Sequence, residues 1–147
     1  MLLLIHLIRG LFVVLLLASA AGKLLDMSGF FLVVARYDVL PVNAIPGLSW
    51  LLTLTELGLG IWLALAPAPV QLARAATAVV SLHLVYMTWL GLAFTRGLNI
   101  QNCGCFGVFF PRPLTMQALL EDSVLLALAV VLVWGARSRL RQQYSPR

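Results

Sequence analysis

The sequence is poor in charge. Asp, Glu, Lys and Arg together make up 10% of its 147 residues, while hydrophobic residues make up 62%. A soluble globular domain carries about 25% charged residues, and a chain this short cannot hide so much apolar surface in a water-soluble core. The shortage of charge therefore excludes a soluble domain, a disordered segment and a coiled coil. It indicates a multi-pass membrane protein that is solvated by the lipid bilayer.

Cysteine and histidine are also scarce, with two residues of each. Two cysteines exclude a disulfide-rich secreted domain, and the lack of a CxxC pair excludes a tetrahedral zinc site, so no metal site is predicted. Ten Lys and Arg residues outnumber five Asp and Glu residues, but they stand at the ends of apolar runs. That placement is typical of membrane topology signals rather than of a basic nucleic-acid surface, and no nucleic-acid partner is expected.

Four apolar runs are each long enough to cross a bilayer, which takes about 20 residues. Because every backbone polar group in lipid needs a partner within the protein, each run must form a helix. We therefore expect a single all-α domain over residues 1–147, built as a bundle of four transmembrane helices. The expected spans are residues 2–22, 47–66, 72–94 and 114–134.

The first of these runs has a second interpretation. Arg9, the apolar stretch 11–17 and the sequence Ala18-Ser19-Ala20 imitate a secretory signal with its cleavage site. A signal peptide begins with a basic region, whereas residues 1–8 are almost entirely apolar. We therefore favour a helix that stays in the protein.

The positive charges predict an orientation. Four spans place both termini on one side of the membrane, and the basic tail over residues 137–147 contains four arginines. The positive-inside rule assigns this side to the cytoplasm. The long connections over residues 23–46 and 96–113 then face the periplasm or the cell exterior, with the spans in the inner (plasma) membrane of a bacterium.

Cys103 and Cys105 lie in the second connection and are separated by one glycine. Disulfides form and persist in the oxidising periplasm. Closing so short a loop stabilises a fold by only about 1.6 kcal/mol, and the strained bond is typical of a labile, redox-active disulfide. We therefore predict that both cysteines are catalytic thiols, although the sequence leaves open which one is the nucleophile. The phenylalanines that follow, Phe106, Phe109 and Phe110, form either an anchor at the membrane surface or a docking surface for a partner.

Glu56 stands in the middle of the second span. It shares one helical face with Ser49, Thr53 and Gly60, and a small and polar face of this kind is expected to point into the bundle. An ionisable residue at this depth raises the free energy by about 2.5–3.5 kcal/mol or more, which makes Glu56 a candidate functional group. The alternative is a protonated side chain that serves packing.

Two further ionisable residues lie inside the predicted spans. His83 stands at about the depth of Glu56, so the two side chains can pair and carry a proton. The alternative for His83 is a neutral ring held by one hydrogen bond. Arg9 lies in the first span, where it either lines a polar path or extends toward the cytoplasm as a topology anchor.

Other charged residues are expected near the outer face as auxiliary groups. Glu121 and Asp122 lie about two turns into the fourth span. They are expected either to pair with Lys23 or Arg96 or to exchange protons with the thiols. The auxiliary set comprises Lys23, Asp26, Arg96, Glu121 and Asp122.

Several motifs together resemble the MauE/DoxX family of redox-associated membrane proteins. They are Gly22-Lys23-Leu24 with Asp26, Tyr37-x-x-Leu40-Pro41, Glu56-Leu57-Gly58 and, most specific, Cys103-Gly104-Cys105-Phe106-Gly107. The resemblance implies a four-helix inner-membrane protein that works beside a periplasmic protein of thioredoxin fold. In the methylamine-utilisation branch it also implies a role in maturing the disulfide-rich small subunit of methylamine dehydrogenase.

The sequence thus favours a membrane thiol–disulfide redox partner of a thioredoxin-fold protein, with Cys103 and Cys105 as the couple. A quinone held between the helices is a candidate cofactor. Whether the chain is an oxidoreductase in its own right or one component of such a system stays open, as does homo-oligomerisation. Two alternatives are a transporter for a small thiol, sulfur species or metal, lined by Glu56, His83 and Arg9, and a non-catalytic scaffold for a redox complex.

Overall fold

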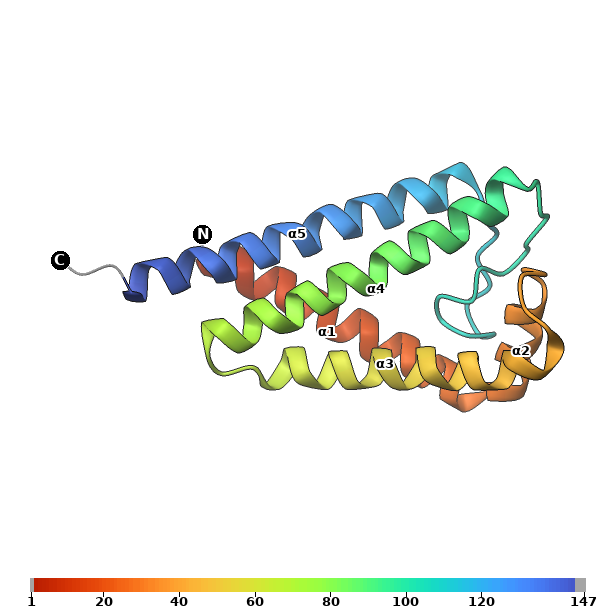
Figure 1. Ribbon diagram of the computed structural model, residues 1–147, viewed down its shortest axis with the longest axis horizontal. Coiled ribbons are helices and arrows are strands. Elements are labelled where there is room, and N and C mark those ends of the chain that lie inside the picture. The colour runs from red at the N-terminus through yellow and green to blue at the C-terminus, as the bar shows by residue number, and fades with distance from the viewer. Residues whose placement is uncertain (1, 145–147) are drawn as a thin grey trace.

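The computed structural model describes residues 2–144, which fold into five α-helices and one short 3₁₀ turn, with no β-strand in that range (Figure 1). The helices are α1 (Leu2–Leu25), α2 (Met27–Ala35), α3 (Ile45–Leu65), α4 (Pro69–Thr95) and α5 (Met116–Tyr144), and the turn η1 (Val42–Ala44) leads into α3. Four of them, with η1 counted together with α3, are long and apolar enough to cross a membrane. The predicted all-α bundle of four spanning helices is therefore confirmed.

Local sequence signals explain where several helices begin. Proline takes the first position of α4, where its missing N–H is harmless. Asp26 separates α1 from α2, and its carboxylate accepts a hydrogen bond of 2.8 Å from the backbone N–H of Gly29. This cap lets the chain start a new helix in a new direction directly after α1.

The basic tail predicted over residues 137–147 continues α5 as a helix as far as Tyr144. Arg137, Arg139 and Arg141 lie within this helix. Arg147 lies outside the described residues.

The four long helices pack as two pairs, α1 along α3 and α4 along α5. The pairs come together at the end that holds the start of α1, the end of α5 and the α3–α4 turn, which we call the terminal end (Figure 1). They diverge toward the opposite end, which holds α2 and the connection over residues 96–115. We call this the cysteine end.

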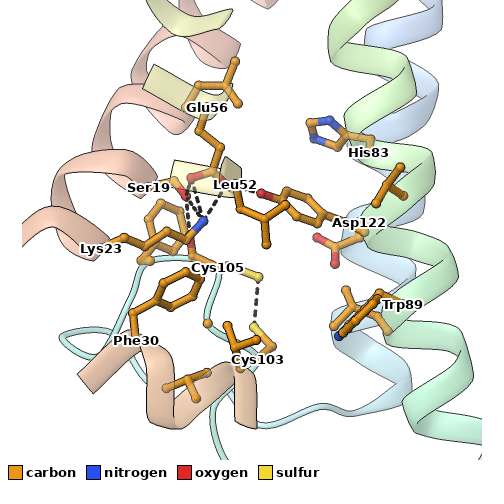
Figure 2. A pocket seen from close by; sticks show the side chains of 18 of the residues that line it. Ser19, Lys23, Phe30, Leu52, Glu56, His83, Trp89, Cys103, Cys105 and Asp122 are labelled. Atoms are coloured by element: carbon orange, nitrogen blue, oxygen red, sulfur yellow. Dashed lines mark hydrogen bonds and ion pairs between the residues drawn. The ribbon is translucent and has the colours of Figure 1, made fainter. Parts of the chain in front are cut away.

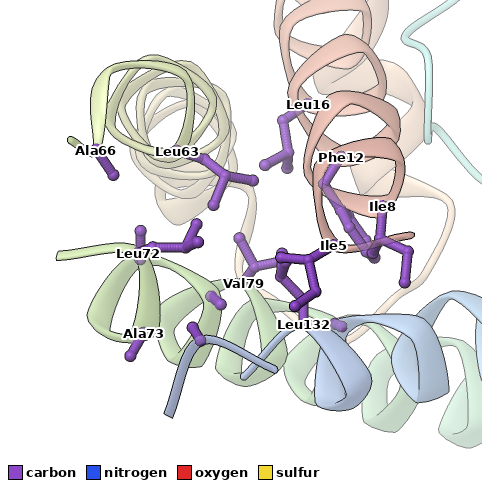
Figure 3. Packing of buried hydrophobic residues seen from close by; sticks show 14 of the residues in the cluster. Ile5, Ile8, Phe12, Leu16, Leu63, Ala66, Leu72, Ala73, Val79 and Leu132 are labelled. Atoms are coloured by element: carbon purple, nitrogen blue, oxygen red, sulfur yellow. The ribbon is translucent and has the colours of Figure 1, made fainter. Parts of the chain in front are cut away.

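A hydrophobic core holds the terminal end together. It combines side chains from all four long helices, among them Phe12, Leu63, Val79 and Leu132, each fully buried (Figure 3). Large apolar side chains on the outside of the bundle, such as Leu3 and Leu51, are exposed. Such an exterior suits a lipid environment, where apolar groups need no cover.

At the cysteine end, the connection over residues 96–115 folds back between the helix pairs and touches α1 through its backbone. A Cβ atom on Gly22 would lie 2.5 Å from the Phe106 carbonyl oxygen, and one on Gly107 would lie 2.5 Å from the Gly22 carbonyl oxygen. Gly107 also has a φ of 69°, a conformation that suits glycine. Two glycines therefore let the connection seat directly on α1.

Candidate functional site

The segment around the two cysteines forms a tight, internally bonded turn. The Asn102 side chain accepts a hydrogen bond of 2.9 Å from the Gly104 N–H and donates one of 3.0 Å to the Gly107 carbonyl. The Tyr37 hydroxyl donates a bond of 2.8 Å to the Cys103 carbonyl. Gly104 has a φ of 82°, so the residue between the cysteines is one that tolerates a left-handed backbone. These bonds fix the direction of both thiols.

Cys103 and Cys105 are free thiols whose Sγ atoms lie 2.9 Å apart. This separation is longer than a covalent S–S bond, which is about 2.05 Å, so the two sulfurs are in direct contact without being bonded. The hydrogen bond from the Cys105 thiol, helped by the Arg112 charge and opposed by burial, lowers the pKa of Cys103 to about 6. Donating that bond, together with burial, raises the pKa of Cys105. The opposite directions of the two shifts make Cys103 the more acidic thiol of the pair.

A buried ion pair lies next to the thiols. Lys23 of α1 and Glu56 of α3 are each 2% exposed, and Lys23 Nζ lies 2.5 and 2.6 Å from the two carboxylate oxygens of Glu56. The Tyr86 hydroxyl of α4 donates a further bond of 2.6 Å to the same carboxylate (Figure 2). A buried charge requires this degree of compensation. The pair explains how a lysine can be buried within the apolar bundle.

Ser19 connects the ion pair to the cysteine turn. Its Oγ lies 2.8 Å from Glu56 Oε2 and 2.5 Å from the Cys105 carbonyl oxygen, and it accepts a bond of 3.0 Å from Lys23 Nζ. A hydroxyl has a single hydrogen, so it can donate to only one of these two acceptors at a time. The Glu56 carboxylate and the backbone of the cysteine turn are thus joined through one side chain.

A cavity of about 180 Å³ lies between the helix pairs, next to the cysteine turn. Cys105, Lys23 and Glu56 lie on the side of α1 and α3, and His83, Trp89 and Asp122 lie on the side of α4 and α5 (Figure 2). Its remaining walls are mostly aliphatic and aromatic. The site therefore joins a dithiol to an apolar chamber with a few polar groups.

Comparison with known proteins identifies the family. The sequence model described as methylamine utilisation protein MauE matches residues 1–135. The chain belongs to the MauE family. Methylamine utilization protein MauE of Paracoccus denitrificans is 30% identical over 128 residues, which cover 87% of this chain and 67% of that protein. No solved structure matches the chain.

The MauE match covers the cysteine turn, the ion pair and most of all four long helices. Family and helices agree on a multi-pass membrane protein. Lys23, Glu56 and the two cysteines, which come from three distant parts of the sequence, all line this cavity.

Of the two alternatives for His83, the structure has the ring held by one hydrogen bond and not the pair with Glu56. The Glu56 carboxylate forms an ion pair with Lys23, whereas His83 Nδ1 lies 2.9 Å from the Val79 carbonyl of its own helix. The His83 ring packs edge-on against Phe12, with centroids 5.3 Å apart. The Lys23 ammonium compensates the buried carboxylate directly, and α4 contributes Tyr86 to it instead of His83. The predicted helical face itself is confirmed, because Ser49, Thr53, Glu56 and Gly60 are all buried.

The acidic residues at the start of α5 also find other partners than expected. Glu121 forms an ion pair with Arg112, which precedes it by nine residues, rather than with Lys23 or Arg96. Arg96 instead binds the backbone carbonyls of Tyr37 and Asp38 at 3.2 and 3.3 Å. Among residues 2–144, nothing forms a hydrogen bond or ion pair with the Asp122 carboxylate, which faces the cavity (Figure 2).

Four other predicted site residues lie apart from the ion pair. Arg9 lies far from the thiols, where it donates bonds of 2.8 Å to the carbonyls of Leu63 and Ala64 at the end of α3. Phe106 lines the cavity, while Phe109 and Phe110 are exposed. The Phe106 ring packs edge-on against the Phe110 ring, with centroids 6.4 Å apart, so these two link the cavity wall to the exposed surface.

The sequence analysis missed the roles of Ser19, Tyr37, Tyr86 and Asn102. Ser19 precedes Lys23 by four residues, so the two share one face of α1, and this spacing was a usable signal. Tyr37 and Tyr86 carried no such signal, because their partners, Cys103 and Glu56, are distant in the sequence. Asn102 bonds to Gly104 and Gly107 within its own turn, and its place next to the cysteines was a usable signal.

Proposed function

We propose that this chain is the membrane thiol–disulfide redox partner of a periplasmic thioredoxin-fold protein. The observation that carries the proposal is the pair of free thiols, Cys103 and Cys105, with sulfur atoms 2.9 Å apart at one end of a membrane bundle. Their opposite pKa shifts supply one ready nucleophile and one proton-bearing partner.

The exchange proceeds in two steps. The Cys103 thiolate attacks a disulfide of the partner, forming a mixed disulfide and releasing one partner thiolate, which takes up a proton. Cys105 then gives up its proton and attacks the Cys103 sulfur, which releases the second partner thiol. The partner gains two electrons, and Cys103 and Cys105 become a disulfide. The reverse sequence oxidises the partner.

The orientation belongs to the same proposal. Arg137, Arg139 and Arg141 lie on α5 near the terminal end, which supports a cytoplasmic position for that end. The cysteine end then faces the periplasm from the inner membrane of a bacterium. Disulfide exchange with a secreted partner requires this side.

The family name suggests the process that the exchange serves. Membership in the family of methylamine utilisation protein MauE supports a role related to methylamine utilisation. We propose that the chain helps to form or rearrange disulfides in a periplasmic client. In the branch that gives the family its name, that client is the small subunit of methylamine dehydrogenase.

Two observations disfavour the transporter alternative. A path lined by Glu56, His83 and Arg9 needs all three side chains along one channel. Glu56 is held in an ion pair with Lys23, and Arg9 does not line the cavity that Glu56 and His83 share but binds the end of α3.

The test is the redox state of the two cysteines in native membranes, read by thiol alkylation and mass shift. Cys105→Ser removes the resolving thiol and is expected to accumulate a mixed disulfide through Cys103. Cys103→Ser is the matched control and should accumulate far less, and the double variant gives the background. Cysteines that stay oxidised or unreactive under every condition, with no trapped thioredoxin-fold protein, would contradict the proposal.

A further inference from the structure

The cavity beside the thiols has the size of one small ring. Its volume is about 180 Å³, and an apolar protein cavity of about 150 Å³ stays dry and binds benzene. Leu52, Phe12 and Phe30 are among the apolar side chains that line it. A flat, apolar ring therefore fits beside Cys105, whereas a hydrated polar solute does not.

The cavity also reaches the surface of the bundle within the membrane. Val85 lines it and is 55% exposed, so the wall at Val85 is shared between the cavity and the outside of α4. Val85 stands ten residues before the end of α4 at Thr95, which places it about 15 Å along the helix from that end. A ligand entering beside Val85 comes from the lipid.

Polar groups face each other across this chamber. The Cys105 sulfur points toward the Asp122 carboxylate on the opposite side, and His83 lies next to Asp122 on the same side (Figure 2). Trp89 adds a flat aromatic side chain to that wall. The Asp122 carboxylate, half-buried, has no hydrogen-bond partner among residues 2–144. An acyl chain in the cavity would leave it unpartnered, but a ring carrying oxygen atoms would not.

We propose that this cavity binds the ring of a membrane quinone and that Asp122 and His83 exchange protons with its oxygen atoms. The inference rests on the proposed function, because it names the carrier for the two electrons that the cysteine couple gains or loses. Trp89 is the stacking surface for the ring.

The two cysteines and the quinone account for all electrons and protons of the reaction. In the direction of disulfide formation, Cys103 and Cys105 lose two electrons and two protons and form one S–S bond. The quinone gains the two electrons and two protons and leaves as the hydroquinone. Cys105 supplies one proton from its thiol, and the second reaches the ring through Asp122 and His83 from the proton pool to which Cys103 gave its own. The reverse reaction reduces the disulfide.

The experiment uses the full chain, reduced, in phosphatidylcholine nanodiscs without oxygen, with ubiquinone-1 as the probe. Disulfide formation is followed by alkylation and mass shift, and hydroquinone by its absorbance. Val85→Trp fills the mouth of the cavity and should slow the reaction about tenfold or more. Leu84→Trp is the matched control, because Leu84 is its neighbour, is exposed and does not line the cavity. It should behave like the unaltered chain.

Two further measurements separate binding from chemistry. A photoreactive azidoquinone should label the α4 and α5 sides of the cavity, and unlabelled quinone should compete while excess phospholipid should not. Asp122→Asn should retain this labelling but slow hydroquinone formation about 100-fold. Competition by phospholipid alone would assign the cavity to an acyl chain and overturn the inference.

The outcomes distinguish the quinone site from the proposed thiol–disulfide exchange with a thioredoxin-fold protein. Both tryptophan variants are also tested for exchange with oxidised thioredoxin, which reports on the fold and on the cysteines alone. Equal quinone rates in the two variants, or no quinone reaction while thioredoxin exchange persists, overturns only the quinone site. Quinone oxidation without thioredoxin exchange overturns only the proposed partner.

Discussion

The two ends of the bundle are held together by different forces. At the terminal end, all four long helices meet in a hydrophobic core around Phe12, Leu63 and Val79. At the cysteine end, the helix pairs separate, and the space between them holds a backbone connection, one buried ion pair and a cavity. The hydrophobic core at the terminal end holds the four long helices together. The cysteine end can therefore accommodate polar side chains and a cavity within the membrane.

The largest effect is expected from breaking the ion pair. Glu56→Leu leaves the Lys23 ammonium buried without its partner, which should lower the free energy of unfolding by about 3–5 kcal/mol. Adding Lys23→Met removes the stranded charge and should restore most of the loss. Denaturation in detergent micelles measures both variants. Equal stability of the single and double variants would show that the ion pair does not hold the cysteine end together.

The complementary experiment disrupts the hydrophobic core at the terminal end. Leu63 is fully buried, so Leu63→Ala should lower the free energy of unfolding by about 2–5 kcal/mol. Alkylation of the cysteines should keep its rate, because the core lies at the other end. Leu65→Ala, two residues further along α3 and exposed, is the control and should change little. A change in thiol reactivity for Leu63→Ala would show that the ends are coupled.

The pKa of Cys103 provides a test of the hydrogen bond between the two thiols at the cysteine end. A pKa of about 6 means that its thiolate is fully formed above that pH and is lost as the pH falls below it. Alkylation should therefore be flat at neutral pH and fall about tenfold per pH unit in acid. Cys105→Ala removes the hydrogen bond and should move the curve to higher pH.

Cys105→Ser retains a hydroxyl donor, so it should move that curve less than Cys105→Ala does. Iodoacetamide rates between pH 5 and 9, read by mass spectrometry, give the curves. Identical curves for Cys105→Ala and the unaltered chain would show that Cys105 does not set the acidity of Cys103.

The smallest effect is expected at Tyr37. Tyr37→Phe removes the hydrogen bond to the Cys103 carbonyl, which should lower stability by about 0.5–1.5 kcal/mol. Hydrogen exchange should rise within residues 100–114 and stay unchanged in the core of α5. Equal changes in both segments would mean that Tyr37 supports the whole bundle rather than the cysteine turn.

The helices could be predicted from the sequence because each span needs about 20 apolar residues and leaves an unmistakable run. The buried face of α3 could also be predicted, since Ser49, Thr53 and Glu56 recur at helical spacing. The partner of Glu56 could not be predicted from the sequence. The choice between Lys23 and His83 depends on how α1 and α4 are rotated and on their depth beside α3, and a pattern within one helix holds no information about its neighbours.

The cysteines were predictable as a pair, but their surroundings were not. The separation of Cys103 and Cys105 by one glycine suffices to suggest redox chemistry. The cavity arises from the divergence of two helix pairs and from the folded connection, both of which depend on contacts between distant residues. For the same reason, the sequence could not show that Phe106 lines the cavity while Phe109 and Phe110 are exposed.

The close contact between Gly22 and Gly107 has a consequence for how the thiols are held. It is made by Cα and carbonyl atoms, which neither titrate nor attract counterions. Ionic strength weakens contacts between exposed charges, but it leaves a contact of this kind unchanged. The contact between the cysteine turn and α1 at these two glycines is therefore steric, and a change in salt concentration should not weaken it.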